Sequence, residues 1–235
     1  MVSSSAWGRV GRAALDLVFP PRCAVCGRGG GFLCEPCTEA LPRALPPRCP
    51  LCWQLLRPPA ACQDCGGHRP AFAGVRAPFS FEGPARELVH ALKYKHFRAL
   101  AEPMALLMTR CLEEEPIPAD TLVPVPLHPL RRRLRGYDQS ALLARELGKL
   151  MGLPVVETAL ARRRATPPLA RGLGAAERRD KVEGAFAVRG DGLSGRRVLL
   201  IDDVTTTGAT LDACARALLD AEAASVWGLT FARED

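Results

Sequence analysis

The chain has 235 residues, and 48% of them are hydrophobic, so it can bury a substantial core and a disordered state is excluded as its main form. Its net charge of +7 favours polyanionic partners without identifying one. No apolar run approaches the ~20 residues of a membrane helix, so we expect no insertion into a membrane.

The first 20 residues carry arginines and a short apolar patch that Asp16 interrupts. No small-residue cleavage site follows this patch. The segment therefore predicts an amphipathic helix over residues 1–20 rather than a signal peptide.

Eight of the ten cysteines form four C-x-x-C pairs within the first 65 residues: Cys23/Cys26, Cys34/Cys37, Cys49/Cys52 and Cys62/Cys65. Each such turn can present two thiolates to one metal ion, and two turns complete a tetrahedral structural zinc site. Eight ligands imply two zinc ions. The short intervals favour sequential pairing, the first pair with the second and the third with the fourth. A cross-braced pairing, first with third and second with fourth, is the alternative.

Two other readings of these cysteines are weaker. A disulfide framework needs an oxidising compartment, which nothing in the N-terminus supports. A redox C-x-x-C needs a thioredoxin-like context, which this glycine- and proline-rich segment lacks. We therefore expect residues 21–69 to form a double zinc ribbon that folds, binds or recruits. Cys111 and Cys214 lie in apolar helical patterns and are expected to be buried packing residues.

From residue 70 to residue 235 strands and helices alternate, which predicts an α/β domain with a largely parallel sheet. In chain order the patterns indicate a strand or hairpin arm over 72–83, helices over 83–94 and 98–114, and a strand over 120–127. A helix over 138–152 follows, with Leu142, Leu143, Leu147 and Leu150 on its apolar side, and then a short strand near Val155, a polar loop over 161–174 and a strand over 184–188. The last elements are a strand over 196–204, a helix over 208–223 and a strand over 225–232.

Two arginine clusters, at 131–135 and 162–164, are expected in loops. Several guanidinium groups in one loop can converge on phosphate.

The stretch VLLIDDVTTTGATL, residues 198–211, joins a buried strand to a helix through two acids and a Thr/Gly loop. Ligands of open α/β sheets bind beyond the carboxyl ends of strands, where Asp202 and Asp203 fall. The loop leads into a helix N-terminus, which binds phosphate through its free amides. Acids for vicinal sugar hydroxyls beside a loop for phosphate match a ribose 5-phosphate. An ordinary strand-loop-helix with a threonine N-cap is the weaker alternative.

Other nucleotide and catalytic motifs are absent from the sequence. It has no G-x-x-x-x-G-K-[ST] for a P-loop, and no G-x-G-x-x-G opens an early strand-to-helix turn. H-E-x-x-H and G-x-S-x-G are absent too, and the four histidines form no spaced cluster.

The acidic and Thr/Gly stretch resembles the PRPP-binding motif of type I phosphoribosyltransferases. Together with the cysteine-rich N-terminus, VPVPLHPLRRRLRGYDQSALLA and ERRDKVEGAFAV, it makes the chain similar to the ComF family from about residue 14 to the end. The resemblance implies a double zinc ribbon followed by a phosphoribosyltransferase-like domain over 70–235. It also implies a cytoplasmic location and a role in natural transformation, with single-stranded DNA and DNA-uptake proteins as partners.

The resemblance implies a role for each part of the motif. Asp202 and Asp203 would hold the ribose hydroxyls. The 5-phosphate would lie on the loop formed by Thr205, Thr206, Thr207, Gly208, Ala209 and Thr210. Pyrophosphate, with a magnesium ion, would lie on the turn and basic segment formed by Val125, Pro126, Arg131, Arg135 and Gly136. Within this segment the chain reads RGYDQ, with Asp138 where the family pattern has asparagine.

Three functions are consistent with these patterns. The first is magnesium-dependent phosphoribosyl transfer from PRPP to a nucleobase. The second is binding of single-stranded DNA by the zinc ribbons and arginine-rich loops. The third is a PRPP-responsive adaptor without turnover, because fold analogy alone does not separate an enzyme from a sensor.

Overall fold

A computed structural model describes residues 20–56, 62, 64–65, 67–164, 175–190 and 192–235. The amphipathic helix expected over residues 1–20 therefore lies outside the described residues, apart from Pro20. Most of the loop expected over 161–174 also lies outside them. None of the helices in the described ranges is long and apolar enough to cross a membrane.

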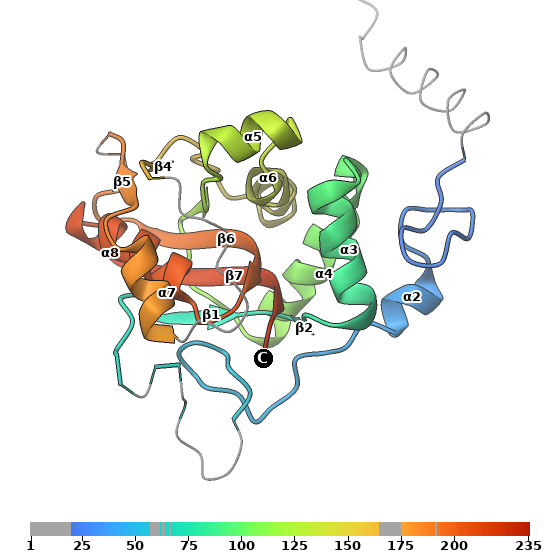
Figure 1. The fold of residues 1–235 in the computed structure, drawn as a ribbon, viewed down its shortest axis with the longest axis horizontal. Coiled ribbons are helices and arrows are strands. Elements are labelled where there is room, and N and C mark those ends of the chain that lie inside the picture. Colours follow the sequence, from blue (N-terminus) through green and yellow to red (C-terminus); the bar gives the residue numbers. More distant parts are fainter. Residues whose placement is uncertain (1–19, 57–61, 63, 66, 165–174, 191) are drawn as a thin grey trace, which may run out of the picture.

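The described elements alternate between helices and strands after the cysteine-rich segment (Figure 1). That segment holds one short helix, α2 (Glu35–Glu39). It is followed by β1 (Gly74–Arg76), β2 (Phe79–Ser80), α3 (Gly83–Tyr94), η1 (Arg98–Leu100), α4 (Ala101–Glu114), β3 (Thr121–Pro124), α5 (Pro129–Arg135) and α6 (Gln139–Met151). The remaining elements are β4 (Leu160–Arg162), α7 (Ala175–Val182), β5 (Phe186–Val188), β6 (Arg197–Thr205), α8 (Ala209–Asp220) and β7 (Ser225–Arg233).

A parallel sheet forms the centre of the α/β part, as the sequence predicts. Its strands run in the order β1-β7-β6-β3, and β2 pairs with β7 beyond β1. At the outer edge, Val155 forms one parallel bridge with Leu122. Residues 198–201 of β6 are fully buried, because a central parallel strand is covered on both faces. β4 and β5 form a separate antiparallel pair.

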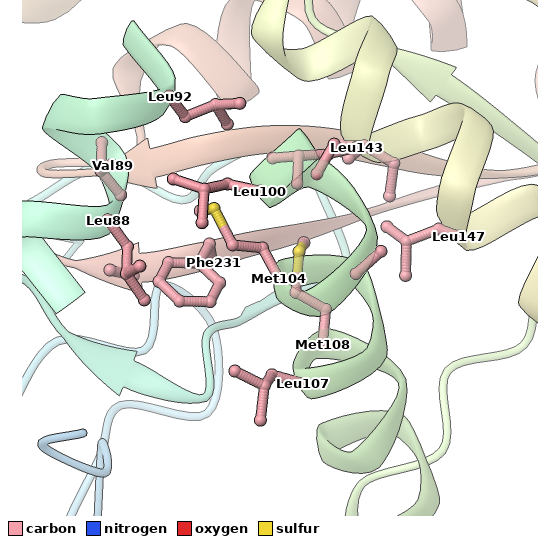
Figure 2. Packing of buried hydrophobic residues seen from close by; sticks show 14 of the residues in the cluster. Leu88, Val89, Leu92, Leu100, Met104, Leu107, Met108, Leu143, Leu147 and Phe231 are labelled. Atoms are coloured by element: carbon pink, nitrogen blue, oxygen red, sulfur yellow. The ribbon is translucent and has the colours of Figure 1, made fainter. Parts of the chain in front are cut away.

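Helices cover both faces of the sheet. On one face α3, α4 and α6 pack their leucines and methionines against the sheet, and Figure 2 shows Leu88 and Met104 beside Phe231 of β7. On the other face α8 and α7 enclose a second cluster that includes Val198. Cys111 and Cys214 are buried within the helices α4 and α8, which confirms them as packing residues.

Several local expectations are wrong. Arg131 to Arg135 lie in α5 rather than in a loop, and Arg162 ends β4. The helix α5 begins at Pro129, whose missing N–H costs nothing at a first helical position, and the ring of His128 caps it by accepting from the N–H of Leu130. Leu150, expected on the apolar side of α6, is half exposed.

The segment expected as a strand or hairpin arm forms two short strands that do not pair with each other. β1 and β2 each pair parallel with β7. The chain does not reverse between them, so β2 continues in the same direction and pairs further along β7. The helix α7 is not indicated by the sequence pattern, since its residues are mostly polar.

Candidate functional site

The eight ribbon cysteines gather into two groups. The first cluster is Cys23, Cys26, Cys34 and Cys37, and the second cluster is Cys49, Cys52, Cys62 and Cys65. Within each cluster all four sulfur atoms lie within 4.8 Å of one another. A tetrahedral zinc ion with Zn–S bonds of about 2.3 Å needs sulfurs about 3.8 Å apart, so both clusters fit zinc. This arrangement confirms the sequential pairing and not the cross-braced alternative.

One thiol in each cluster has a lowered pKa, whereas burial and the neighbouring thiols raise the pKa of Cys37 and of Cys65 to about 12. Burial alone would raise the pKa of Cys23, but backbone N–H groups of Cys26, Cys34 and Val25 bind its sulfur and lower that pKa to about 6. The pKa of Cys49 is lowered in the same way, by N–H groups of Cys52 and Leu51, against the effect of burial. All ten cysteines are free of disulfides. Thiolates held by backbone amides are the form that zinc binds.

The acid pair lies where β6 ends, and each acid has a partner from a different helix. The ammonium of Lys93, near the end of α3, lies 2.7 Å from Oδ1 of Asp203. The hydroxyl of Ser140, in the first turn of α6, donates to Oδ1 of Asp202 at 2.7 Å. Two helices on one face of the sheet therefore hold the two carboxyl groups in place.

The charges of this cluster depend on one another. Burial, and then the neighbouring Asp203, raise the pKa of Asp202 to about 7. Burial would lower the pKa of Lys93, but the Asp203 carboxylate outweighs it and raises that pKa, so the ammonium stays charged. Oδ2 of Asp203 is buried and has no hydrogen-bond partner among the described residues. This oxygen is an acceptor that a ligand hydroxyl can satisfy.

The loop after β6 has the shape of a phosphate cradle. Thr205 is the last residue of β6, and Gly208, with φ of +78°, begins α8. The positive φ favours glycine at this position, and a Cβ on Gly208 would lie only 3.3 Å from the ring of Phe72. Of the first amides of α8, that of Ala209 donates to the hydroxyl of Thr207 at 3.4 Å. The amides that follow it in the first turn have no acceptors within the helix and can bind an anion. Thr206, Thr207, Ala209 and Thr210 complete this segment, which we call the phosphate loop after the ligand that the sequence predicts for it.

The turn after β3 offers fewer free backbone N–H groups than its resemblance to a pyrophosphate loop implies. The N–H of Val125 donates to the carbonyl of Ile201 at 2.9 Å, and Pro126 has no N–H. The N–H of Leu127 donates to Oδ2 of Asp138 at 2.8 Å. These amides are therefore not free to bind an anion, and the basic side chains nearby belong to the following helix, α5.

Asp138 has a structural role that accounts for its place in RGYDQ. Its side chain caps α6 by accepting from the N–H groups of Ser140 and Ala141, in addition to Leu127. Burial raises its pKa, although these three donors lower it. Asp138 thus ties the turn after β3 to the helix that holds Ser140.

A cavity of about 370 Å³ lies between the end of α3 and the helix α5. Arg131, Arg135, Leu134, Lys93, Tyr94 and His96 line it. The guanidinium of Arg135 lies 5.3 Å from the ring centroid of Tyr94. Gly136, with φ of +75°, ends α5 and accepts from Arg98 through its carbonyl. Arg131 and Arg135 thus share a cavity lining with Lys93, whose ammonium pairs with Asp203. Their role in binding pyrophosphate, and that of Gly136, stays a prediction.

Lys93, Tyr94 and Ser140 belong to this site, and sequence reasoning missed all three. Lys93 and Tyr94 end an amphipathic helix, and Ser140 follows an N-cap, so each has an ordinary local explanation. No motif marks them, because they reach the acid pair through packing.

Comparisons with known proteins agree with this architecture. The family model described as a double zinc ribbon domain matches residues 14–66. The DNA utilization protein YhgH of Salmonella typhi is 30% identical over 201 residues, which cover 83% of this chain and 87% of that protein. The chain belongs to the ComF/YhgH competence protein family.

A second relative matches a shorter region of this chain. Competence protein F of Haemophilus influenzae is 39% identical over 114 residues, so the match spans 47% of this chain and about half, 49%, of that protein. Among solved structures, the glutamine phosphoribosylpyrophosphate amidotransferase of B. subtilis complexed with ADP and GMP is 21% identical, with a TM-score of 0.37, over 55% of this chain and 26% of that chain. A TM-score at this level supports no statement about function.

We expect the purified ComF/YhgH protein to hold two zinc ions per chain, one in each cluster. The variant Cys26→Ser/Cys37→Ser should hold one, because two thiolates do not complete a tetrahedral site. Metal analysis of the purified chains measures this. The control Cys111→Ser, which changes a buried cysteine outside both clusters, should keep two. Equal zinc content in all three chains would contradict the assignment.

The raised pKa of Asp202 predicts a pH-dependent stability. The folded state keeps the Asp202 proton up to about pH 7, whereas the unfolded chain releases it near pH 4. Ionisation therefore costs free energy only in the folded state, and stability falls as the pH rises between these values, by up to about 1.4 kcal/mol per pH unit. We expect Asp202→Asn to lack this slope, measured by denaturant unfolding from pH 5 to pH 8 with zinc present. Parallel curves for wild type and variant would contradict it.

Proposed function

We propose that this protein binds PRPP at the carboxyl edge of its sheet and transfers the phosphoribosyl group to a nitrogen nucleophile. The ribose hydroxyls would donate to Asp202 and Asp203, and the 5-phosphate would lie on the phosphate loop. The diphosphate would lie in the cavity beside α5. Each part of the ligand then meets groups of the chemistry it needs.

The observation that carries this proposal is the unsatisfied Oδ2 of Asp203 beside an open helix N-terminus. A buried carboxylate oxygen without a donor is costly, and a sugar hydroxyl supplies the missing donor. The amides at the start of α8 lie only a few residues further along the same chain. A ligand with a hydroxyl and a phosphate on one small ring fits both needs.

The cavity beside α5 supplies positive charge for the diphosphate. Arg131 and Arg135 can each bind phosphate oxygens through paired N–H groups, and Lys93 stands between them and Asp203. The ligand would bring magnesium with its diphosphate, and the metal would share the negative charge of the leaving group.

The transfer is a displacement at the anomeric carbon. The bond from this carbon to the diphosphate oxygen breaks, a bond to the acceptor nitrogen forms, diphosphate leaves, and the nitrogen gives its proton to solvent. Positive charge develops on the sugar ring, and the two carboxyl groups lie where they stabilise it. The arginines stabilise the charge on the departing diphosphate.

The names of the relatives suggest where this chemistry is used. Because they are called competence and DNA utilization proteins, we infer that this protein acts in the handling of DNA taken up by the cell. A nucleobase is the acceptor that suits such a role.

Calorimetry with magnesium and PRPP tests the proposal, with pyrophosphate release from a panel of nucleobases followed in the same samples. Asp203→Asn should weaken PRPP binding about 10- to 100-fold, because a charge-assisted hydrogen bond to a hydroxyl is lost. The matched control is Asp120→Asn, which removes a carboxylate at the opposite end of β6, where Asp120 pairs with Arg197. This control should bind PRPP as the wild type does.

The outcomes separate the alternatives. Binding with pyrophosphate release supports transfer. If PRPP binds but no nucleobase of the panel causes pyrophosphate release, transfer is overturned and a PRPP-responsive adaptor is left. Absence of binding by the wild type overturns the proposed ligand.

A second candidate function, binding of single-stranded DNA, is favoured by the surface of α5. This short helix exposes Arg132 and Arg133, together with Leu130 and Leu134, which is 85% exposed. The ring of Tyr94, 67% exposed, lines the same cavity as Leu134 and Arg135 of this helix. Cations for phosphates next to an exposed ring for a base are the elements of a single-strand site.

Arg132→Gln/Arg133→Gln should weaken binding of a fluorescent oligothymidine and reduce the slope of log affinity against log salt by about 1.4, as expected for two lost phosphate contacts. Fluorescence anisotropy at several salt concentrations measures both. The control Arg86→Gln/Arg110→Gln removes two exposed arginines from α3 and α4 and should change neither. An equal loss in both double variants would show a response to net charge rather than a site on α5.

A further inference from the structure

Arg233, at the end of β7, is a fully buried cation. Its Nη2 donates to Oδ2 of Asp64 at 2.6 Å and to the side chain of Gln54. Its Nε and Nη1 are buried and have no hydrogen-bond partner among the described residues, and Nε lies 3.9 Å from Oδ1 of Asp235, within ion-pair distance but too far for a hydrogen bond. A buried guanidinium with two unsatisfied donors is expensive, so these donors indicate an acceptor that completes the site.

The second cluster surrounds the partners of this arginine. Asp64 lies between Cys62 and Cys65, and Gln54 lies two residues after Cys52. Four thiolates around one Zn²⁺ carry a net charge of −2, and the sulfurs accept N–H hydrogen bonds. A dianionic zinc site is therefore the acceptor that the unsatisfied donors fit.

The first cluster has no equivalent. The arginine next to it, Arg22, is exposed and donates to a backbone carbonyl of Gly27. No fully buried cation other than Arg233 occurs in the described ranges. The two zinc sites therefore differ in how their charge is compensated.

The same arginine is joined to the phosphate loop. In the sheet Arg233 is in register with Thr205, and the N–H of Glu234 donates to the carbonyl of Thr205 at 2.9 Å. Cys52 and Cys65 line a small cavity together with Thr207 and Gly208.

The chain that follows the second cluster is fixed to α8 as well. Asp212, in the first turns of α8, accepts from the N–H of Ala71 at 2.6 Å and lies 2.9 Å from the ring nitrogen of His68. Phe72 then covers Gly208. The phosphate loop is thus held from both sides by segments that depend on the second cluster.

We propose that Arg233 is the charge partner of zinc in the second cluster, and that through Arg233 this zinc site holds the phosphate loop in shape. The first zinc ion has no part in this coupling. The inference rests on the proposed function only for the identity of the loop's ligand, because the coupling itself is measured without PRPP.

Zinc affinity tests the first half of the proposal. In full-length chains carrying Cys26→Ser/Cys37→Ser, which hold only the second metal, Arg233→Gln should lower the zinc affinity about 10- to 100-fold in a chelator competition. Cobalt in place of zinc should show a shifted sulfur-to-metal charge-transfer band, since hydrogen bonds to the thiolates are lost. The control is Arg48→Gln, which removes another arginine of the same junction with a side chain only 4% exposed, paired with Asp235.

Hydrogen–deuterium exchange of residues 205–210 tests the second half. Chelation of zinc from the wild type should speed exchange of this loop, and Arg233→Gln should show fast exchange even with zinc bound. Arg48→Gln should destabilise the chain without changing the cobalt spectrum or the zinc dependence of loop exchange. If it reproduces every effect of Arg233→Gln, the proposal is overturned, because a general loss of packing explains the data.

Arg233→Lys gives the answer if Arg233→Gln does not fold. Lysine keeps the charge but loses the planar fork, so zinc affinity should fall by less while the cobalt band still shifts. If the charge-transfer band of the cobalt form is unchanged in a folded Arg233→Lys chain, the proposal that Arg233 donates hydrogen bonds to the cysteine sulfurs is overturned. Absence of PRPP binding by the wild type would remove the proposed ligand and leave the zinc and exchange results standing.

Discussion

The site depends on holding two adjacent carboxyl groups at the end of one buried strand. Like charges on neighbouring residues raise the free energy of the folded state unless each finds its own partner. Here Lys93 from α3 compensates Asp203, and Ser140 from α6 binds Asp202. The packing of α3, α4 and α6 against the sheet therefore does more than bury leucines, because it delivers the groups that make the acid pair possible.

The cysteine-rich segment is attached to the sheet rather than joined to it by a free linker. Among its described residues Leu41 is the one large aliphatic or aromatic side chain that is buried, so its fold must rely on metal and on contacts with the α/β part. Arg233, Asp235 and Asp212 supply those contacts from the ends of β7 and α8. The part of the segment that carries the second cluster therefore lies at the carboxyl edge of the sheet, where ligands of α/β proteins bind.

The basic segment after β3 shows how a local pattern is changed by its surroundings. Consecutive arginines suggest a solvated loop, yet α5 forms because Pro129 begins it, His128 caps it and Gly136 ends it. Its basic last turn also suits the negative end of the helix dipole. The helix places its arginines on a wall shared with Lys93 and Tyr94, so one surface serves both candidate ligands, diphosphate and a nucleic acid strand.

The sequence by itself determined the features that depend on near neighbours. Three features are predicted from short stretches of sequence, and the fold agrees with each. They are the cysteine clusters, the buried strand β6 with its two acids, and the glycine before α8. Only the tertiary structure decided which groups meet. Lys93 reaches Asp203 across 110 positions, and Arg233 reaches Asp64 across 169. Such pairs leave no periodic trace, because their partners are chosen by packing in three dimensions.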